Sequence, residues 1–116
     1  MAGEGREPLV SERLTLAQLA RGAALRTRGV ASLDPRPPMA ATTAAGERVD
    51  GLVCVAAPGG RYEITLYVVA RPVSLERLAE DLRERVRRSA EANGFGDELG
   101  PVNVIVTDVV TEEDRR

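Results

Sequence analysis

The chain has 116 residues, 16 of them basic and 18 acidic, and its net charge of −2 excludes a bulk field that would hold nucleic acid or an anionic membrane. It contains no His, Lys or Trp and one Cys, so the usual side chains of acid–base, nucleophilic and metal chemistry are nearly absent. We expect one domain with a small core, no catalytic residue, no cofactor and no metal site.

Cys54 lies inside an apolar run, which predicts a small buried hydrophobe rather than a reactive thiol. One Cys cannot form an intrachain disulfide, and this count fits a reducing compartment. The first residues include Glu4, Arg6 and Glu7 and show no apolar signal-peptide region, and no apolar run is long enough to span a bilayer. We therefore expect a cytoplasmic protein that does not insert directly into a membrane.

The N-terminal part predicts a mobile tail at residues 1–8 followed by a helix. Thr15 and Gln18 have the spacing of a capping box, and Ser11 is an alternative helix start one turn earlier. Gly29 is placed to end this helix in a left-handed conformation. The side chains that share one face at helical spacing are Leu16, Leu19, Ala20, Ala23 and Thr27.

A Pro/Ala-rich stretch at residues 34–46 predicts a loop, disordered rather than functional, because its prolines oppose helix formation and its small side chains bury little. Residues 49–56 then predict a short apolar strand. A turn at Pro58, Gly59 and Gly60 leads into a second strand at residues 61–70, so the two strands are expected to form a hairpin.

Strict alternation in the second strand is typical of a half-buried antiparallel strand. The inward set is Tyr62, Ile64, Leu66 and Val68, and the outward set is Arg61, Glu63, Thr65 and Tyr67. We expect the inward set in the core and the outward set against solvent or a partner.

A long amphipathic helix is predicted from the N-cap Ser74 to about Asn93, with Gly94 following it. Its apolar stripe consists of Leu75, Leu78, Ala79, Leu82, Val86, Ser89 and Ala90. Oppositely charged side chains four positions apart pair Arg77 with Asp81, Glu84 with Arg88, and Arg87 with Glu91. Because acidic residues interleave with the arginines, we interpret the outer side as a solvated face and not a nucleic-acid helix.

The last strand is predicted at residues 102–110, before a polar tail at 111–116. Within it Val102, Val104 and Val106 share one face, opposite Asn103, Ile105 and Thr107. A helix between two strands makes them parallel neighbours. The expected fold is α+β: a single domain over residues 9–110, a two-layer sandwich in the order αββαβ, with two helices covering one face of a three-stranded mixed sheet.

The chain resembles the alkaline shock protein 23 family, the Gls-type envelope stress response proteins of bacteria. The resemblance rests on the run YEITLYVVARPVSLERLAEDLRERVRRSAEANG followed by VNVIVTDVV, on the Gly29–Val30 step after the first helix, and on the tyrosine-and-valine pattern at residues 66–69. It covers residues 14–110. It implies an abundant, non-enzymatic cytoplasmic protein that forms homo-oligomers, is held near the membrane by a small membrane-anchored partner, and supports cell-envelope homeostasis.

Two binding hypotheses follow. The first is an assembly module that joins copies of itself or a small membrane-anchored protein through the outward set or an unpaired strand edge, with no nucleic acid and no small-molecule substrate. The alternative is an RNA-binding KH-like module, which requires a GXXG loop with basic flanks, whereas residues 94–100 carry Asp97 and Glu98. An enzyme would depend on Cys54 or adjacent carboxylates without a His to act as base, so we expect none.

Overall fold

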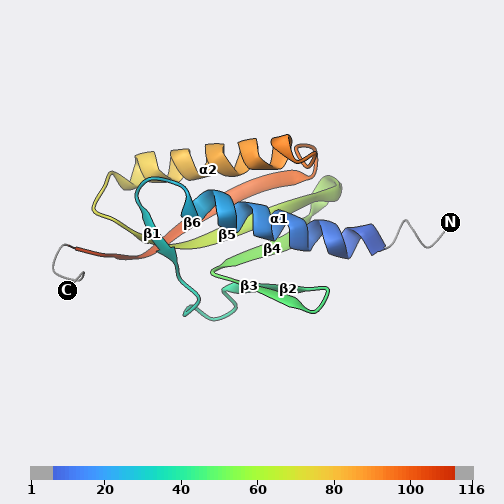
Figure 1. Cartoon of the computed structure of the whole chain (residues 1–116), viewed down its shortest axis with the longest axis horizontal. Helices are drawn as coiled ribbons and strands as arrows, with labels where there is room; N and C mark the ends of the chain where they lie inside the picture. The colour runs from blue at the N-terminus through green and yellow to red at the C-terminus, as the bar shows by residue number, and fades with distance from the viewer. Residues whose placement is uncertain (1–6, 112–116) are drawn as a thin grey trace.

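The computed structural model describes the backbone of residues 7–111 and the side chains of residues 12–111. The elements are α1 (Glu7–Leu25), β1 (Val30–Leu33), β2 (Ala41–Ala44), β3 (Glu47–Asp50), β4 (Leu52–Ala57), the short turn η2 (Pro58–Gly60), β5 (Arg61–Ala70), α2 (Leu75–Ala92) and β6 (Leu99–Val109). Both helices pack on the mixed sheet, and the β2–β3 hairpin lies beside it (Figure 1). The α+β class is confirmed.

The sheet is built around β5. On one side β5 pairs with β6 in parallel, as predicted for strands joined by a helix. On the other side it pairs antiparallel with β4 along its first half and with β1 at its end. The predicted three-stranded sheet is therefore wrong in strand number, because β1 was missed and the β2–β3 hairpin forms a second sheet.

The change of partner along β5 occurs at Tyr67. Its N–H donates to the carbonyl of Gly51 (2.9 Å), and its carbonyl accepts from the N–H of Asp34 (2.8 Å). Gly51 has a φ of +87°, and a Cβ there would lie 2.5 Å from the Cβ of Leu33. Only glycine fits this position, because the chain must turn where the ends of β1 and β4 meet.

The predictions for residues 34–57 need correction. The expected loop contains β2, and the expected strand at 49–56 is divided by Gly51 into the end of β3 and β4. Small residues serve close packing here: α1 contacts β2, and Ala40 and Ala44 are buried. Composition suggested that this stretch has little to bury, but small side chains let two backbones approach each other.

Helix α1 is already formed at Glu7, so neither Thr15 nor Ser11 starts it, and Glu7 and Pro8 do not belong to a tail. Pro8 is tolerated in the first turn because an N–H there has no intrahelical acceptor. The helix ends at Leu25, sooner than predicted, and the Thr27 hydroxyl donates to the carbonyl of Ala23 (2.9 Å). The remaining residues of the two predicted tails, 1–6 and 112–116, lie outside the described part of the chain.

Gly29, predicted as the cap of α1, instead precedes β1 with a φ of +99°. A Cβ at this position would approach the side chains of Val73 and Leu78 at 3.1 and 3.2 Å. Its carbonyl accepts from the N–H of Arg71 (2.8 Å). The glycine therefore allows the start of α2 to lie against the beginning of β1.

The predictions for α2 and its flanking residues hold in most details. Ser74 caps the helix by accepting from the N–H of Arg77 (3.4 Å), and Gly94 follows the C-cap with a φ of +85°. Leu75 is an exception to the predicted stripe because it is exposed. The pairs Glu84–Arg88 and Arg87–Glu91 are confirmed, whereas Arg77–Asp81 is not among the ion pairs of the described residues.

One core joins both helices to the inward face of the sheet. The inward set of β5 is buried as predicted, Cys54 is completely buried, and Val102, Val104 and Val106 pack against the same core. Its largest fully buried members are Leu16, Leu52, Ile64, Leu66, Leu78 and Leu82. None of the described helices is long and apolar enough to cross a membrane.

Candidate protein-interaction surface

The outward set lies where the alternation predicted, on the face of β5 that is turned away from the core. Arg61 is exposed, and Glu63, Thr65 and Tyr67 are half-buried between their neighbours on β4 and β6. This outer face has no helix packed on it, because α1 and α2 contact each other on the opposite side (Figure 1).

Three of these four residues form side-chain hydrogen bonds with β6. The Asn103 amide donates to the Glu63 carboxylate (2.7 Å) and to the Thr65 hydroxyl (3.3 Å). The Arg61 guanidinium donates to the carbonyl of Leu99 (3.1 Å). These polar groups therefore hold β6 against β5, and they contribute to a partner surface mainly by fixing its shape.

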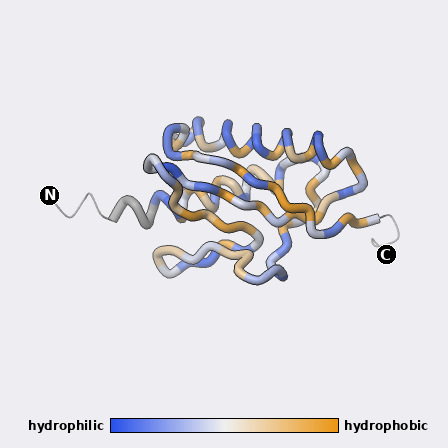
Figure 2. Tube along the Cα trace, turned by 180° about the vertical axis from the view of Figure 1, so that it is seen from behind, coloured by the Kyte–Doolittle hydropathy of each residue, from blue (hydrophilic) through white to orange (hydrophobic). Residues whose placement is uncertain are grey.

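The most exposed apolar side chains of the outer face were not among the predicted candidates. Val55 on β4 is 45% exposed and Ile105 on β6 is 44% exposed. Val55 lies opposite Glu63, and Ile105 lies opposite Tyr67. The sequence does contain a signal for Val55 and Ile105. Both lie in apolar strands, and alternation along a strand turns every second side chain outward. Figure 2 shows the molecule from behind, with hydrophobic stretches along the strands.

The free edge of β4 is closed by two side chains. The Thr42 hydroxyl donates to the carbonyl of Leu52 (3.0 Å) and accepts from the N–H of Cys54 (2.9 Å). The Arg13 guanidinium donates to the carbonyls of Cys54 (3.4 Å) and Thr43 (2.9 Å). The carbonyl of Leu52 and both backbone groups of Cys54, which a further strand would use, are thus already paired. Burial raises the pKa of the Cys54 thiol to about 11, so it stays protonated and enclosed.

The free edge of β6 is open by comparison. The carbonyl of Val102 points away from β5, because it accepts from the Arg83 guanidinium on α2 (2.9 Å). Backbone groups alternate along a strand, so the N–H and C=O groups of Val104 and Val106 face the same way. No strand of the described chain lies beyond β6, and residues 102–107 carry no charge. This edge has the properties of a template for strand pairing.

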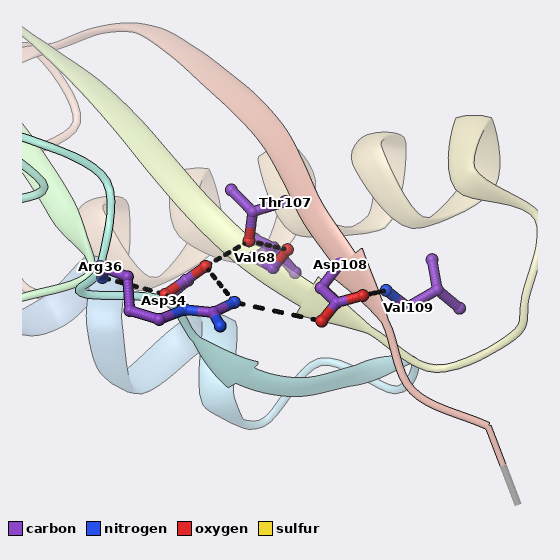
Figure 3. A network of polar contacts seen from close by, with 6 residues as sticks. All are labelled: Asp34, Arg36, Val68, Thr107, Asp108 and Val109. Atoms are coloured by element: carbon purple, nitrogen blue, oxygen red, sulfur yellow. Dashed lines mark hydrogen bonds and ion pairs between the residues drawn. The ribbon is translucent and has the colours of Figure 1, made fainter. Parts of the chain in front are cut away.

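A hydrogen-bond network around the buried carboxylate of Asp34 crosses β5 near the end of the outer face (Figure 3). Asp34 is 3% exposed and accepts from the Arg36 guanidinium (2.8 and 3.0 Å), from the Arg36 N–H (2.9 Å) and from the Thr107 hydroxyl (2.7 Å). The Arg36 hydrogen bonds, followed by that of Thr107, hold the pKa of Asp34 well below its usual value. Arg36 also lies 4.0 Å from Asp108. The network fastens the chain after β1 to β6, across β5.

Among the described side chains, those of residues 12–111, no three acidic or thiol groups converge in a way that could hold a metal ion. Comparisons with protein-family models, with curated proteins and with solved structures gave no match. The outer face and the β6 edge present hydrogen-bonding backbone groups, apolar side chains and an arginine–carboxylate pair.

Proposed function

We propose that this chain is a non-enzymatic assembly module that pairs the open edge of β6 with the same edge of a second copy. The observation that carries the proposal is the contrast between the two edges of one sheet, since the β4 edge is closed by Thr42 and Arg13 while the β6 edge is not. Pairing two β6 strands would join two sheets into one and give partners to the outward backbone groups of Val104 and Val106.

Charges on α2 support an antiparallel arrangement of the two copies. Arg83 marks the side of α2 that faces the β6 edge. Helical spacing places Glu76, Glu80 and Arg87 on this side as well. On this side the acidic residues come before Arg83, whereas Arg87 is already ion-paired with two carboxylates of its own helix. A twofold axis that pairs the β6 strands antiparallel sets the acidic half of each helix toward Arg83 of the other copy, and Arg83 forms no ion pair among the described residues.

The biological setting of this module rests on the family resemblance alone. On that basis we propose that the assembly acts in the bacterial cytoplasm, in the envelope stress response, with a small membrane-anchored protein as a further partner. The exposed apolar residues Val55 and Ile105 give the outer sheet face an area that could receive that partner.

The test compares two lysine substitutions at equally exposed apolar positions on the same sheet face. Ile105→Lys places a charge beside the open β6 edge, and Val55→Lys places one beside the closed β4 edge. We expect Ile105→Lys to weaken self-association about tenfold or more, measured by sedimentation velocity across a concentration series, because edge lysines oppose strand pairing. Val55→Lys is expected to leave self-association unchanged.

Two outcomes would contradict the proposal. A wild-type chain that stays monomeric at every concentration would exclude self-assembly. Equal weakening by Val55→Lys and Ile105→Lys would show that copies stack through the outer face and do not pair through the β6 edge. Circular dichroism of both variants checks that the fold is retained, and neither site is deeply buried.

A further inference from the structure

A second surface lies between the helices, on the other side of α2. A groove of about 720 Å³ runs between the C-terminal end of α1 and the second half of α2. Arg85 and Arg88 line it from α2, and Arg26 and Arg28 line it from the residues just after α1. Helical spacing separates Arg85 and Arg88 from the side marked by Arg83, so this groove is independent of the β6 edge.

The groove has an excess of positive charge. Its lining includes four arginines and two carboxylates, Asp81 and Glu84. Glu84 is already neutralised, since its carboxylate accepts from Arg87 (2.6 Å) and Arg88 (2.8 Å), and these hydrogen bonds lower the pKa of Glu84. Three guanidiniums remain without an ion pair or side-chain hydrogen bond among the described residues, those of Arg26, Arg28 and Arg85.

Arginines on the two sides of α2 differ in whether they form ion pairs. On the outer side, Arg87 lies between Glu84 and Glu91 and forms ion pairs of 2.6 and 2.7 Å with them. On the groove side, Arg85 forms no ion pair among the described residues, although Asp81 lies four positions before it, and it lines the same groove as the arginines that follow α1. The Arg26 guanidinium extends back along α1, within 3.3 Å of the place a Cβ on Gly22 would occupy. Three guanidiniums, one from α2 and two from the residues just after α1, thus line one groove together with the small side chains of Ala23, Ser89 and Ala92.

We infer that this groove binds an acidic peptide segment of a partner protein. Guanidinium groups bind carboxylates through paired N–H donors, and several of them spread along an open groove match carboxylates spaced along a chain. Asp81 interrupts the basic lining, and a continuous phosphate backbone would have to pass this carboxylate. A peptide can place a neutral residue there. Charge complementarity therefore favours a peptide over nucleic acid.

The binding test uses a short fluorescein-labelled peptide in which Glu alternates with Ser, followed by fluorescence anisotropy at low and at physiological ionic strength. The groove variant is Arg26→Gln with Arg85→Gln. The matched control is Arg71→Gln with Arg77→Gln, which removes the same charge from exposed positions outside the groove. We expect the groove variant to weaken peptide binding about tenfold and the control variant less than about twofold. Only the groove variant removes guanidinium donors that line the groove.

Equal losses in the groove and control variants would overturn the inference, since binding would then follow net charge alone. A single-stranded oligonucleotide that competes better than the Glu–Ser peptide would also overturn it, in favour of nucleic acid. A Gln–Ser peptide must fail to bind. Ile105→Lys distinguishes the two proposals, because it should weaken self-association and leave peptide binding unchanged. Failure of one proposal therefore does not imply failure of the other.

Discussion

The two edges of the sheet are built differently although both belong to the same four-stranded layer. Along β4, the side chains of Thr42 and Arg13 form hydrogen bonds with outward backbone groups of Leu52 and Cys54, so these groups are not available to another strand. Along β6, the Arg83 guanidinium donates to one carbonyl, and none of the described strands lies beside the outward groups of Val104 and Val106. An exposed strand edge invites association, and proteins normally protect it. The difference between the two edges is the basis of the proposal that copies pair through β6.

The largest stability effect is expected where the closed edge is opened. Thr42→Val keeps the shape of the side chain but removes the hydroxyl that bonds to Leu52 and Cys54. Both residues are completely buried, so an unpaired carbonyl and an unpaired N–H would remain. We expect a loss of about 1–3 kcal/mol in the free energy of unfolding, measured by urea denaturation.

Thr43→Val is the matched control, because Thr43 is the exposed neighbour on β2. Its substitution should change the free energy of unfolding by no more than about 0.5 kcal/mol. Amide exchange at Cys54 should accelerate only in Thr42→Val. If the two variants were equally stable, the hydroxyl of Thr42 would not be what closes the β4 edge.

The Asp34 network connects the two sides of β5, and its contribution should depend on pH. Its folded-state pKa lies below the usual value of 3.8, so the stabilisation is present above about pH 4 and is lost as the pH falls through the unfolded-state pKa toward the folded one. Asp34→Asn should therefore be less stable than the wild type at neutral pH, and the difference should shrink in acid.

Thermal unfolding of the wild type and Asp34→Asn between neutral pH and about pH 2 measures this difference. Thr107→Val tests the other half of the network, since it removes the hydroxyl that donates to Asp34 across β5. A stability gap that stays constant over the whole pH range would show that Asp34 acts through packing and not through its charge.

The smallest effect concerns the two arginines that reach the edges. Arg13→Met removes the donor to two carbonyls at the closed edge and should cost about 1 kcal/mol. Arg83→Met removes one exposed hydrogen bond at the open edge and should cost only a few tenths of a kcal/mol. Both variants keep an apolar stem of similar length. If both variants lost the same free energy of unfolding in urea denaturation, the two edges would be equally protected by these arginines.

Local patterns predicted the elements whose faces are set by their own periodicity. The alternation in β5, the burial of Cys54, and the cap and pairs Glu84–Arg88 and Arg87–Glu91 of α2 were all predicted from spacing. The β2–β3 hairpin was missed because its small residues show little periodicity and gain their burial from α1. The Arg-lined groove was missed because Arg26 and Arg85 lie on different elements.

The sequence by itself determined which side chains of β5 and α2 turn inward, since hydrophobic burial acts on every second residue of a strand and on one stripe of a helix. Only the tertiary structure decided which edge of the sheet stays open. That outcome depends on Thr42 reaching β4 and on Arg13 reaching the carbonyl of Cys54, which lies 41 positions away in the chain. Such contacts form only after the chain has folded back on itself, and no local spacing encodes them.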